Sequence, residues 1–110
     1  MIQITFFRNS DGVFTGFESE GHAGFAEHGH DIVCAAVSVL VINTINSIEN
    51  FTTDLFSVSE DEKSGRIEFQ FQSDVSHDSK VLMNSFFLGI QGILREYNND
   101  DYIRLILKEV

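Results

Sequence analysis

The chain contains no proline and only one cysteine, Cys34, among its 110 residues. Because proline is absent and no stretch is rich in serine and glycine, no segment has the composition of a linker or a disordered tail. A single cysteine excludes an internal disulfide, so the fold does not depend on an oxidising compartment. We therefore expect one compact domain that spans residues 1–110.

Basic residues are also scarce, with 7 lysines and arginines against 17 aspartates and glutamates, which gives a formal net charge of -10. Such a charge repels phosphate backbones and predicts that the protein does not bind nucleic acid directly. It either maintains solubility or attracts a basic protein or peptide. The charge alone does not decide between these two roles.

Targeting signals are missing from the start of the chain. Residues 1–8 lack the basic start and the long apolar run of a signal peptide. We also expect that no stretch reaches the roughly 20 apolar residues that cross a bilayer. These observations predict a soluble cytoplasmic protein without a membrane partner.

The spacing of the apolar residues predicts a regular order of elements. Ile2, Ile4 and Phe6 alternate with less apolar positions, residues 9–12 have turn chemistry, and residues 13–20 return as a second strand. From Asp31, a plausible N-cap, to about residue 50 the apolar residues follow helical spacing. They are Val33, Val37, Leu40, Val41, Ile45 and Ile48.

The second half repeats this order. Strands at about 55–60 and 66–72 form another hairpin, and Ser76 can cap a helix that ends near residues 98–99. A final strand follows at 102–108. The order ββαββαβ predicts an α+β sandwich in which two helices pack on a mostly antiparallel or mixed sheet. Eleven phenylalanines and a hydrophobic fraction of 43% can supply its core.

Cys34 is the best candidate for chemistry. If Asp31 caps the helix, Cys34 occupies the third helical position, where unpaired backbone N–H groups and the helix dipole favour a thiolate. His22 lies twelve residues upstream, across a loop that contains Gly21, Gly24 and Gly29, and can act as its general base. Asp31 could orient an imidazole, and Ser38, one turn after Cys34, could hydrogen-bond nearby.

Other interpretations of the same residues remain open. Cys34 could be a small buried apolar residue, Asp31 only a helix cap, and the loop glycines only positions of positive backbone dihedral. Nitrogen and sulfur atoms for a zinc site could come from His22, His28, His30 and Cys34, although their spacing matches structural zinc loops poorly.

The segments Gly21-His22-Ala23 and Gly29-His30-Asp31-Ile32-Val33-Cys34-Ala35-Ala36-Val37-Ser38 resemble the signature of the bacterial ribosomal-processing cysteine protease family, Prp. The resemblance implies that His22 and Cys34 form the catalytic pair. It places Asp31 and Ser38 in the active-site region with less certain roles and gives His30 none. It also implies the ββαββαβ fold, no metal and no cofactor.

This resemblance further implies a substrate. Family members remove an N-terminal extension from a basic protein, large-subunit ribosomal protein number twenty-seven, after a phenylalanine-containing segment, and so support ribosome assembly. It implies a homodimer and a glycine-rich loop that covers the bound peptide. The alternative function is a non-catalytic acidic module that binds ribosomal components, in which Cys34 is merely buried.

Overall fold

The structure is a computed structural model, and it describes residues 1–21, 30–97 and 102–110, with the side chains of His30, Asp31 and Tyr97 outside the description. The elements follow the predicted order ββαββαβ. They are β1 (Ile2–Arg8), β2 (Phe14–Glu20), α1 (His30–Phe51), β3 (Phe56–Asp61), β4 (Arg66–Phe71), α2 (His77–Tyr97) and β5 (Ile103–Glu109).

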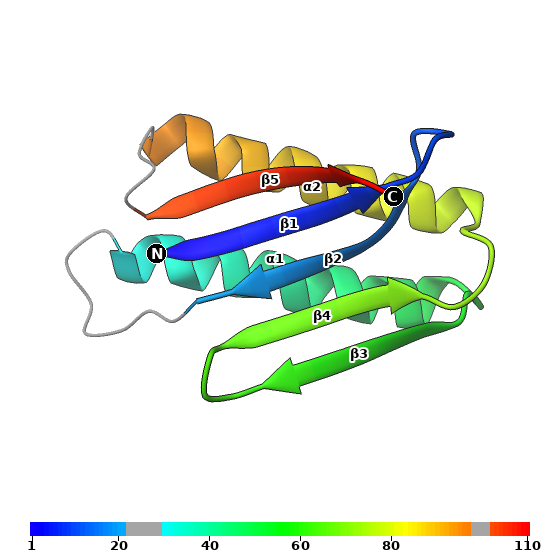
Figure 1. Ribbon diagram of the computed structural model, residues 1–110, viewed down its shortest axis with the longest axis horizontal. Helices are drawn as coiled ribbons and strands as arrows, with labels where there is room; N and C mark the ends of the chain where they lie inside the picture. The colour runs from blue at the N-terminus through cyan, green and yellow to red at the C-terminus, as the bar shows by residue number, and fades with distance from the viewer. Residues whose placement is uncertain (22–29, 98–101) are drawn as a thin grey trace.

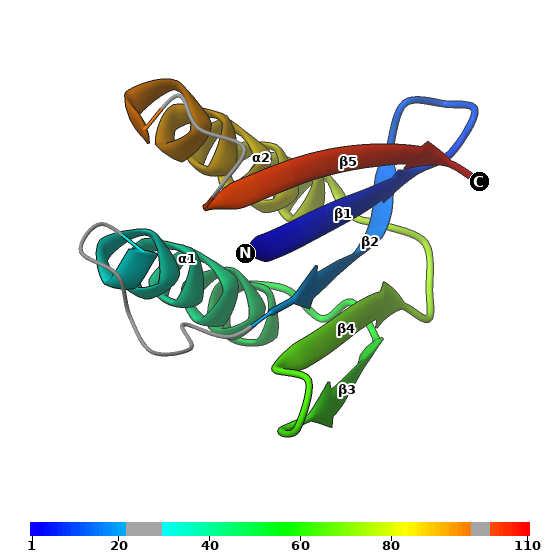
Figure 2. The same ribbon diagram turned by 60° about the vertical axis from the view of Figure 1, so that its left-hand side comes forward.

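The strands form one mixed sheet in the order β3-β4-β2-β1-β5. The pairs β1–β2, β2–β4 and β3–β4 are antiparallel, whereas β1 and β5 are parallel. Both helices lie on one face of this sheet (Figures 1 and 2). The predicted α+β sandwich with a mixed sheet is thus confirmed.

The core lies between the sheet and the helices and is dominated by phenylalanine rings. Phe6 on β1 packs against Phe86 and Phe87 of α2 with ring centroids 5.0 Å apart in each pair. Phe17 stacks on Phe69 across β2 and β4 at 5.2 Å. Each fully buried ring of this kind contributes about 1.5–3 kcal/mol through burial. The alternation that predicted the strands therefore also places the rings on one face.

Helix α1 buries one side and exposes apolar residues on the other. Val33, Val37, Val41 and Ile48 are buried against the sheet, as their spacing predicted. On the outer side, Ile32, Val39 and Ile42 are at least half exposed, with Val39 at 66%. The outer side of α1 is thus more apolar than the solvent-facing side of an ordinary amphipathic helix.

The start of α1 differs from the prediction. The helix begins at His30, so Asp31 is its second residue rather than its N-cap. Helix ends fray, and their bounds commonly differ by one or two residues. The consequence is that Cys34 lies deeper in the helix than expected.

The composition of α1 also corrects an expectation about membranes. The segment Ile32–Phe51, which is 20 residues long, is long and apolar enough to cross a bilayer by length and composition alone. The expectation that no such stretch exists is therefore wrong. In the structure the helix packs its buried side on the sheet, as the core helix of a globular protein does.

Helix α2 begins with the predicted N-cap, Ser76, which also hydrogen-bonds to a residue that the sequence did not indicate. The amide of Ser79 donates to Ser76 Oγ at 3.3 Å, which confirms Ser76 as the N-cap. In addition, the amide and hydroxyl of Ser76 donate to Asp54 Oδ2 at 2.9 and 2.7 Å. Asp54 therefore ties the loop after α1 to the start of α2.

Candidate active site

Of the residues predicted to form the site, the structure describes Gly21, Cys34 and Ser38 fully. His22, Gly24 and Gly29 lie outside the described residues, and so does the side chain of Asp31. The pairing of His22 with Cys34 therefore stays a prediction. What the structure does define is the surface on which Cys34 and Ser38 lie.

Cys34 is the fifth residue of α1 and is partly exposed. It packs against the edge of the hydrophobic core, and Ser38 lies exposed one turn further along the helix. Since the field of a helix terminus falls off within its first turn, it supports a thiolate at Cys34 less strongly than the expected third position would. Cys34 is therefore partly buried against the core and partly accessible.

A cavity of about 250 Å³ opens beside Cys34, between the first half of α1 and the ends of three strands. Its walls are mostly apolar, and none of the described charged side chains lines it. It is lined by Ile2, Ser19, Gly21, Cys34, Val37, Ser38, Val41, Ile42, Gly65 and Ile67. The cavity thus brings Cys34 and Ser38 together with Gly21, the residue that precedes His22.

Gly21 has a conformation that no other residue adopts easily. Its φ is +119°, and a Cβ atom at this position would overlap the carbonyl oxygen of Met1. Its amide donates to the carbonyl of Ser64 in the β3–β4 turn at 3.3 Å. Glycine is therefore required here by sterics. The expected flexible loop of Gly21, Gly24 and Gly29 stays a prediction, because only its first residue is described.

The strands below the cavity are joined by charges on the opposite face of the sheet. Arg66 at the start of β4 contacts Glu18 of β2 and Glu68 of β4, at 3.1 Å in each case. The hydrogen bond and charge of Glu18, followed by the charges of Glu68 and Glu20, raise the pKa of Arg66. This network holds β2 against β4 where Ser19 and Ile67, paired in register, line the cavity.

A zinc site finds no support in the described part of the chain. Across residues 1–21, 30–97 and 102–110, no three His, Cys, Asp or Glu side chains gather as a metal site would need. Of the four candidate ligands, only the side chain of Cys34 is described. The described residues thus offer a thiol beside a cavity and no set of metal ligands.

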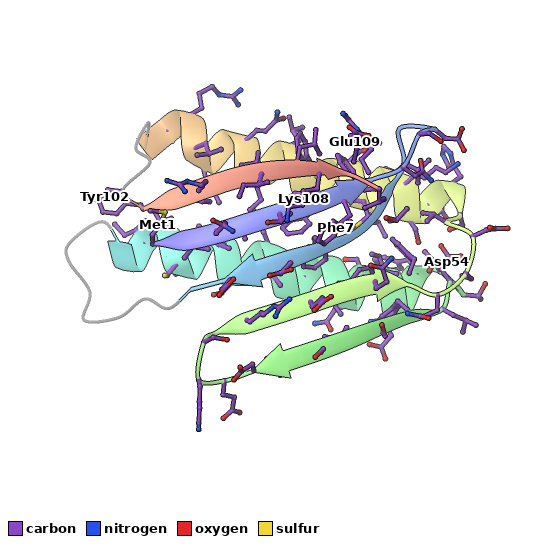
Figure 3. All side chains as sticks on the ribbon, in the orientation of Figure 1. Met1, Phe7, Asp54, Tyr102, Lys108 and Glu109 are labelled. Carbon is purple, nitrogen blue, oxygen red and sulfur yellow. The ribbon has the colours of Figure 1, made fainter. Side chains whose placement is uncertain are left out.

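The site faces the end of the molecule where Met1 and Tyr102 lie, and Asp54 lies at the opposite end (Figure 3). Sequence reasoning missed Ser19, Gly65 and Ile67 as parts of the site. They could not be found by a motif, because they come from two strands that the sheet brings beside the cysteine helix. The one sequence feature that pointed to Ser19 was its place on the side of the predicted strand that faces the helices.

Solved structures with the same fold define the class of protein. The Staphylococcus aureus ribosomal processing protease Prp in complex with a substrate peptide superposes with a TM-score of 0.89 at 28% identity, over 98% of this chain and 100% of that one. The same protease with a covalently linked product peptide gives a TM-score of 0.86 at 29% identity with the same coverage. The fold is that of a cysteine protease.

The sequence comparisons agree over nearly the full length. The family model described as cysteine protease Prp matches residues 1–104. The ribosomal processing cysteine protease Prp of Bacillus subtilis is 31% identical over 106 residues, which are 91% of this chain and 93% of that protein. Its Staphylococcus aureus counterpart is 29% identical over 98% of this chain and its own full length. This chain belongs to the Prp family of cysteine proteases.

Proposed function

We propose that this protease removes an N-terminal extension from large-subunit ribosomal protein number twenty-seven by cutting after a phenylalanine-containing segment. The names of its relatives and the peptide complexes of the Staphylococcus aureus protease support a ribosomal peptide as the substrate. The net charge of -10 favours a basic ribosomal protein. An apolar cavity beside the cysteine favours a substrate segment with large uncharged side chains.

In the proposed mechanism the Cys34 thiolate attacks the carbonyl carbon of the scissile bond, and His22 protonates the leaving amine. Water, activated by His22, then releases the acyl-enzyme. The observation that carries the proposal is that Gly21 and Cys34 line one cavity. Gly21, which directly precedes His22 in the sequence, therefore lies on the wall of the cavity that also contains the proposed nucleophile.

Two further residues have proposed supporting roles. Asp31, three residues before Cys34, would orient an imidazole, and Ser38 would hydrogen-bond to the bound peptide. Ser38 is supported by its exposed place on the cavity, one turn from Cys34. The proposed attack by Cys34 and the proton transfer from His22 require neither residue directly.

We also propose that the protein is a cytoplasmic homodimer. The exposed apolar residues Ile32, Val39 and Ile42 on the outer side of α1 support a subunit contact, because a second copy would remove them from water. Sedimentation velocity tests this: V39D should sediment as a monomer at concentrations where the wild type is a dimer. A wild-type protein that is monomeric throughout would contradict the dimer.

The catalytic assignment is tested with a synthetic peptide that matches the extended N-terminus of the ribosomal protein. Mass spectrometry locates the cut and follows its rate for wild type, C34A, C34S, H22A and the control H77A. His77 is an exposed histidine at the start of α2. We expect no turnover by the Cys34 and His22 variants, wild-type turnover by H77A, and similar melting temperatures throughout. Turnover by C34A or H22A would refute the mechanism.

A further inference from the structure

A groove of about 390 Å³ lies between the end of α1 and the first turns of α2. We call it the α1–α2 groove, and it is lined by Phe51, His77, Asp78, Val81 and Leu82. The end of α1 and the start of α2 lie at the same end of the molecule, opposite the start of α1 (Figure 1). The proposed cleavage by Cys34 and His22 does not use this surface.

Two exposed side chains make the α1–α2 groove apolar. Phe51 is 72% exposed and is the only exposed phenylalanine in the part of the chain that the structure describes, whereas most of the others lie in the core or pack against it. Val81 is 51% exposed. Side chains as exposed as these add little burial to the fold, and a partner that covered them would gain the free energy of that burial. Their place on one groove therefore indicates a contact surface.

The charges beside the groove limit the kind of partner. Asp78 lines the groove, and Asp54 lines an adjoining hollow that shares Phe51 and Asp78 with it. Of the lysines and arginines in residues 1–21, 30–97 and 102–110, none lines either hollow, and Lys80 lines a different one. A purely apolar partner would remove water from Asp78 without compensation, and the net charge of -10 repels nucleic acid and anionic membranes. The groove thus favours a cationic partner.

Arginine and lysine side chains fit both properties of the groove. Their aliphatic stems can pack on Phe51 and Val81 while the charged end lies beside Asp78. A cation over an aromatic ring gains further free energy, and arginine can donate two parallel hydrogen bonds to one carboxylate. A segment of protein that is rich in arginine and lysine therefore matches the groove in shape and in charge.

We propose that the α1–α2 groove is an exosite, a contact away from the scissile bond, and that Phe51, Val81 and Asp78 bind a basic segment of the protein substrate there. The proposal rests on the proposed peptidase function and adds a contact with the body of the substrate, beyond the peptide that is cut. The exosite contributes to binding and takes no part in the chemistry at Cys34.

The length of α1 sets which substrates can reach the exosite. Phe51 follows Cys34 by seventeen residues on this helix, so the two lie about 26 Å apart along its axis. An extended chain covers at most about 3.3–3.6 Å per residue and needs at least about eight residues to join them. A peptide that ends sooner after the cut bond occupies only the active site. Substitutions in the groove should therefore leave its cleavage unchanged.

The test compares the full extended ribosomal protein with a synthetic peptide that ends within about five residues after the cut bond. The ratio of kcat/KM between the two substrates is measured for wild type, F51A, V81A and D78N. We expect wild type to favour the protein about tenfold, and F51A and V81A to lower this ratio toward one by raising KM at unchanged kcat. D78N should lower it about threefold, and more at low salt, because exposed charges are screened.

Leu88→Ala and Glu96→Gln are matched controls on α2. Leu88 is 62% exposed, Glu96 is an exposed acid, and neither lines the groove or the adjoining hollow. Both variants should keep the wild-type ratio. An unchanged ratio in F51A would overturn the proposal, and so would an equal loss in L88A or E96Q. Equal slowing of both substrates by F51A would overturn it as well, because the residue would then act on the fold.

Binding separates the exosite from the peptidase mechanism. The mature ribosomal protein, which lacks the extension, is titrated calorimetrically into C34A and into the C34A/F51A double variant. Weaker binding to the double variant supports the exosite whatever the turnover, whereas equal binding to the two or no binding to C34A overturns it. If wild type cuts neither substrate, the proposed function fails and this titration still decides on the exosite. If F51A converts a dimer into a monomer in sedimentation velocity, the groove is a contact between copies and the exosite proposal fails.

Discussion

At one end of the sheet lie the turn after β1 and the loops that precede β3 and α2, and we call this the capping end. At the other lie the end of β2, the start of α1 and the β3–β4 turn, which we call the active-site end (Figure 1). Every strand and helix runs between these two ends. They differ in how their polar groups are satisfied.

At the capping end, side-chain oxygens accept hydrogen bonds from backbone amides that have no partner within the turns. Asn9 Oδ1 accepts from the amides of Asp11 and Val13 at 2.9 and 3.1 Å. Asp54 accepts twice from Ser76. These local bonds are what a stable turn and a capped helix need.

At the active-site end, the structure shows a backbone hydrogen bond and a cavity. Gly21 is held by a backbone hydrogen bond to Ser64 and has a conformation that is strained for any other residue, and Ser19 lines the cavity. A cavity separates α1 from the strands there. Among the described residues, side-chain hydrogen bonds thus stabilise the turns of the capping end, whereas the other end holds a cavity beside Cys34.

The largest effect should come from Gly21→Ala. The methyl group would overlap the Met1 carbonyl and would force a φ of +119° on alanine, so we expect a loss of at least ~2 kcal/mol in the free energy of unfolding. Urea denaturation measures it, and the cleavage rate should fall as well. Gly12 is the matched control at the capping end, because its φ is +78° but nothing lies within 4 Å of the position that a Cβ atom would take there. An equal loss in G12A and G21A would contradict the steric argument.

Asp54→Asn should have the next largest effect, and on stability only. Removing the carboxylate weakens two hydrogen bonds to Ser76 at the start of α2, which costs about 1–3 kcal/mol. Cleavage of the synthetic peptide should keep its wild-type rate, because Asp54 lies at the end away from Met1 (Figure 3), whereas Cys34 lines a cavity with Ile2. Asp78→Asn, also in the first turn of α2, should cost less since Asp78 is exposed. Reduced cleavage by a folded D54N protein would contradict the view that the capping end affects stability and not catalysis.

The sequence predicted what depends on local chemistry. Alternation placed Ile2, Ile4 and Phe6 on the buried face of β1 because one face of this sheet is covered by helices. Ser76 was predictable as a cap, because a cap acts within three residues of itself. The cysteine motif also identified the helix that borders the cavity.

What depends on distant residues was not predictable from one sequence. Asp54 is 22 residues from Ser76, so no local pattern connects them. The parallel pairing of β1 with β5 follows from the path of the whole chain. Ser19 looked like an ordinary strand residue, because the cavity exists only where α1, β2 and β4 meet. The first helical residue, His30, differed from the expectation because a sequence pattern places the ends of a helix only to within a few residues.

The smallest effect should appear in the dependence of stability on pH. The nearby hydroxyl of Ser79 and the hydrogen bonds from Ser76 lower the pKa of Asp54 below its ordinary value of 3.8 in the folded state, despite some opposing desolvation. A group whose pKa is lower in the folded than in the unfolded state stabilises the fold above its unfolded pKa and loses that contribution as the pH falls through the folded value. Asp54 therefore contributes fully at neutral pH and progressively less below about pH 3.8. Denaturation curves between neutral pH and about pH 2 should show a smaller acid-induced loss in D54N than in wild type. The other carboxylates titrate in both proteins, so the difference between the two curves isolates this one side chain at the capping end. Parallel curves over the whole range would mean that Ser76 and Ser79 stabilise the loop equally whether or not Asp54 is charged.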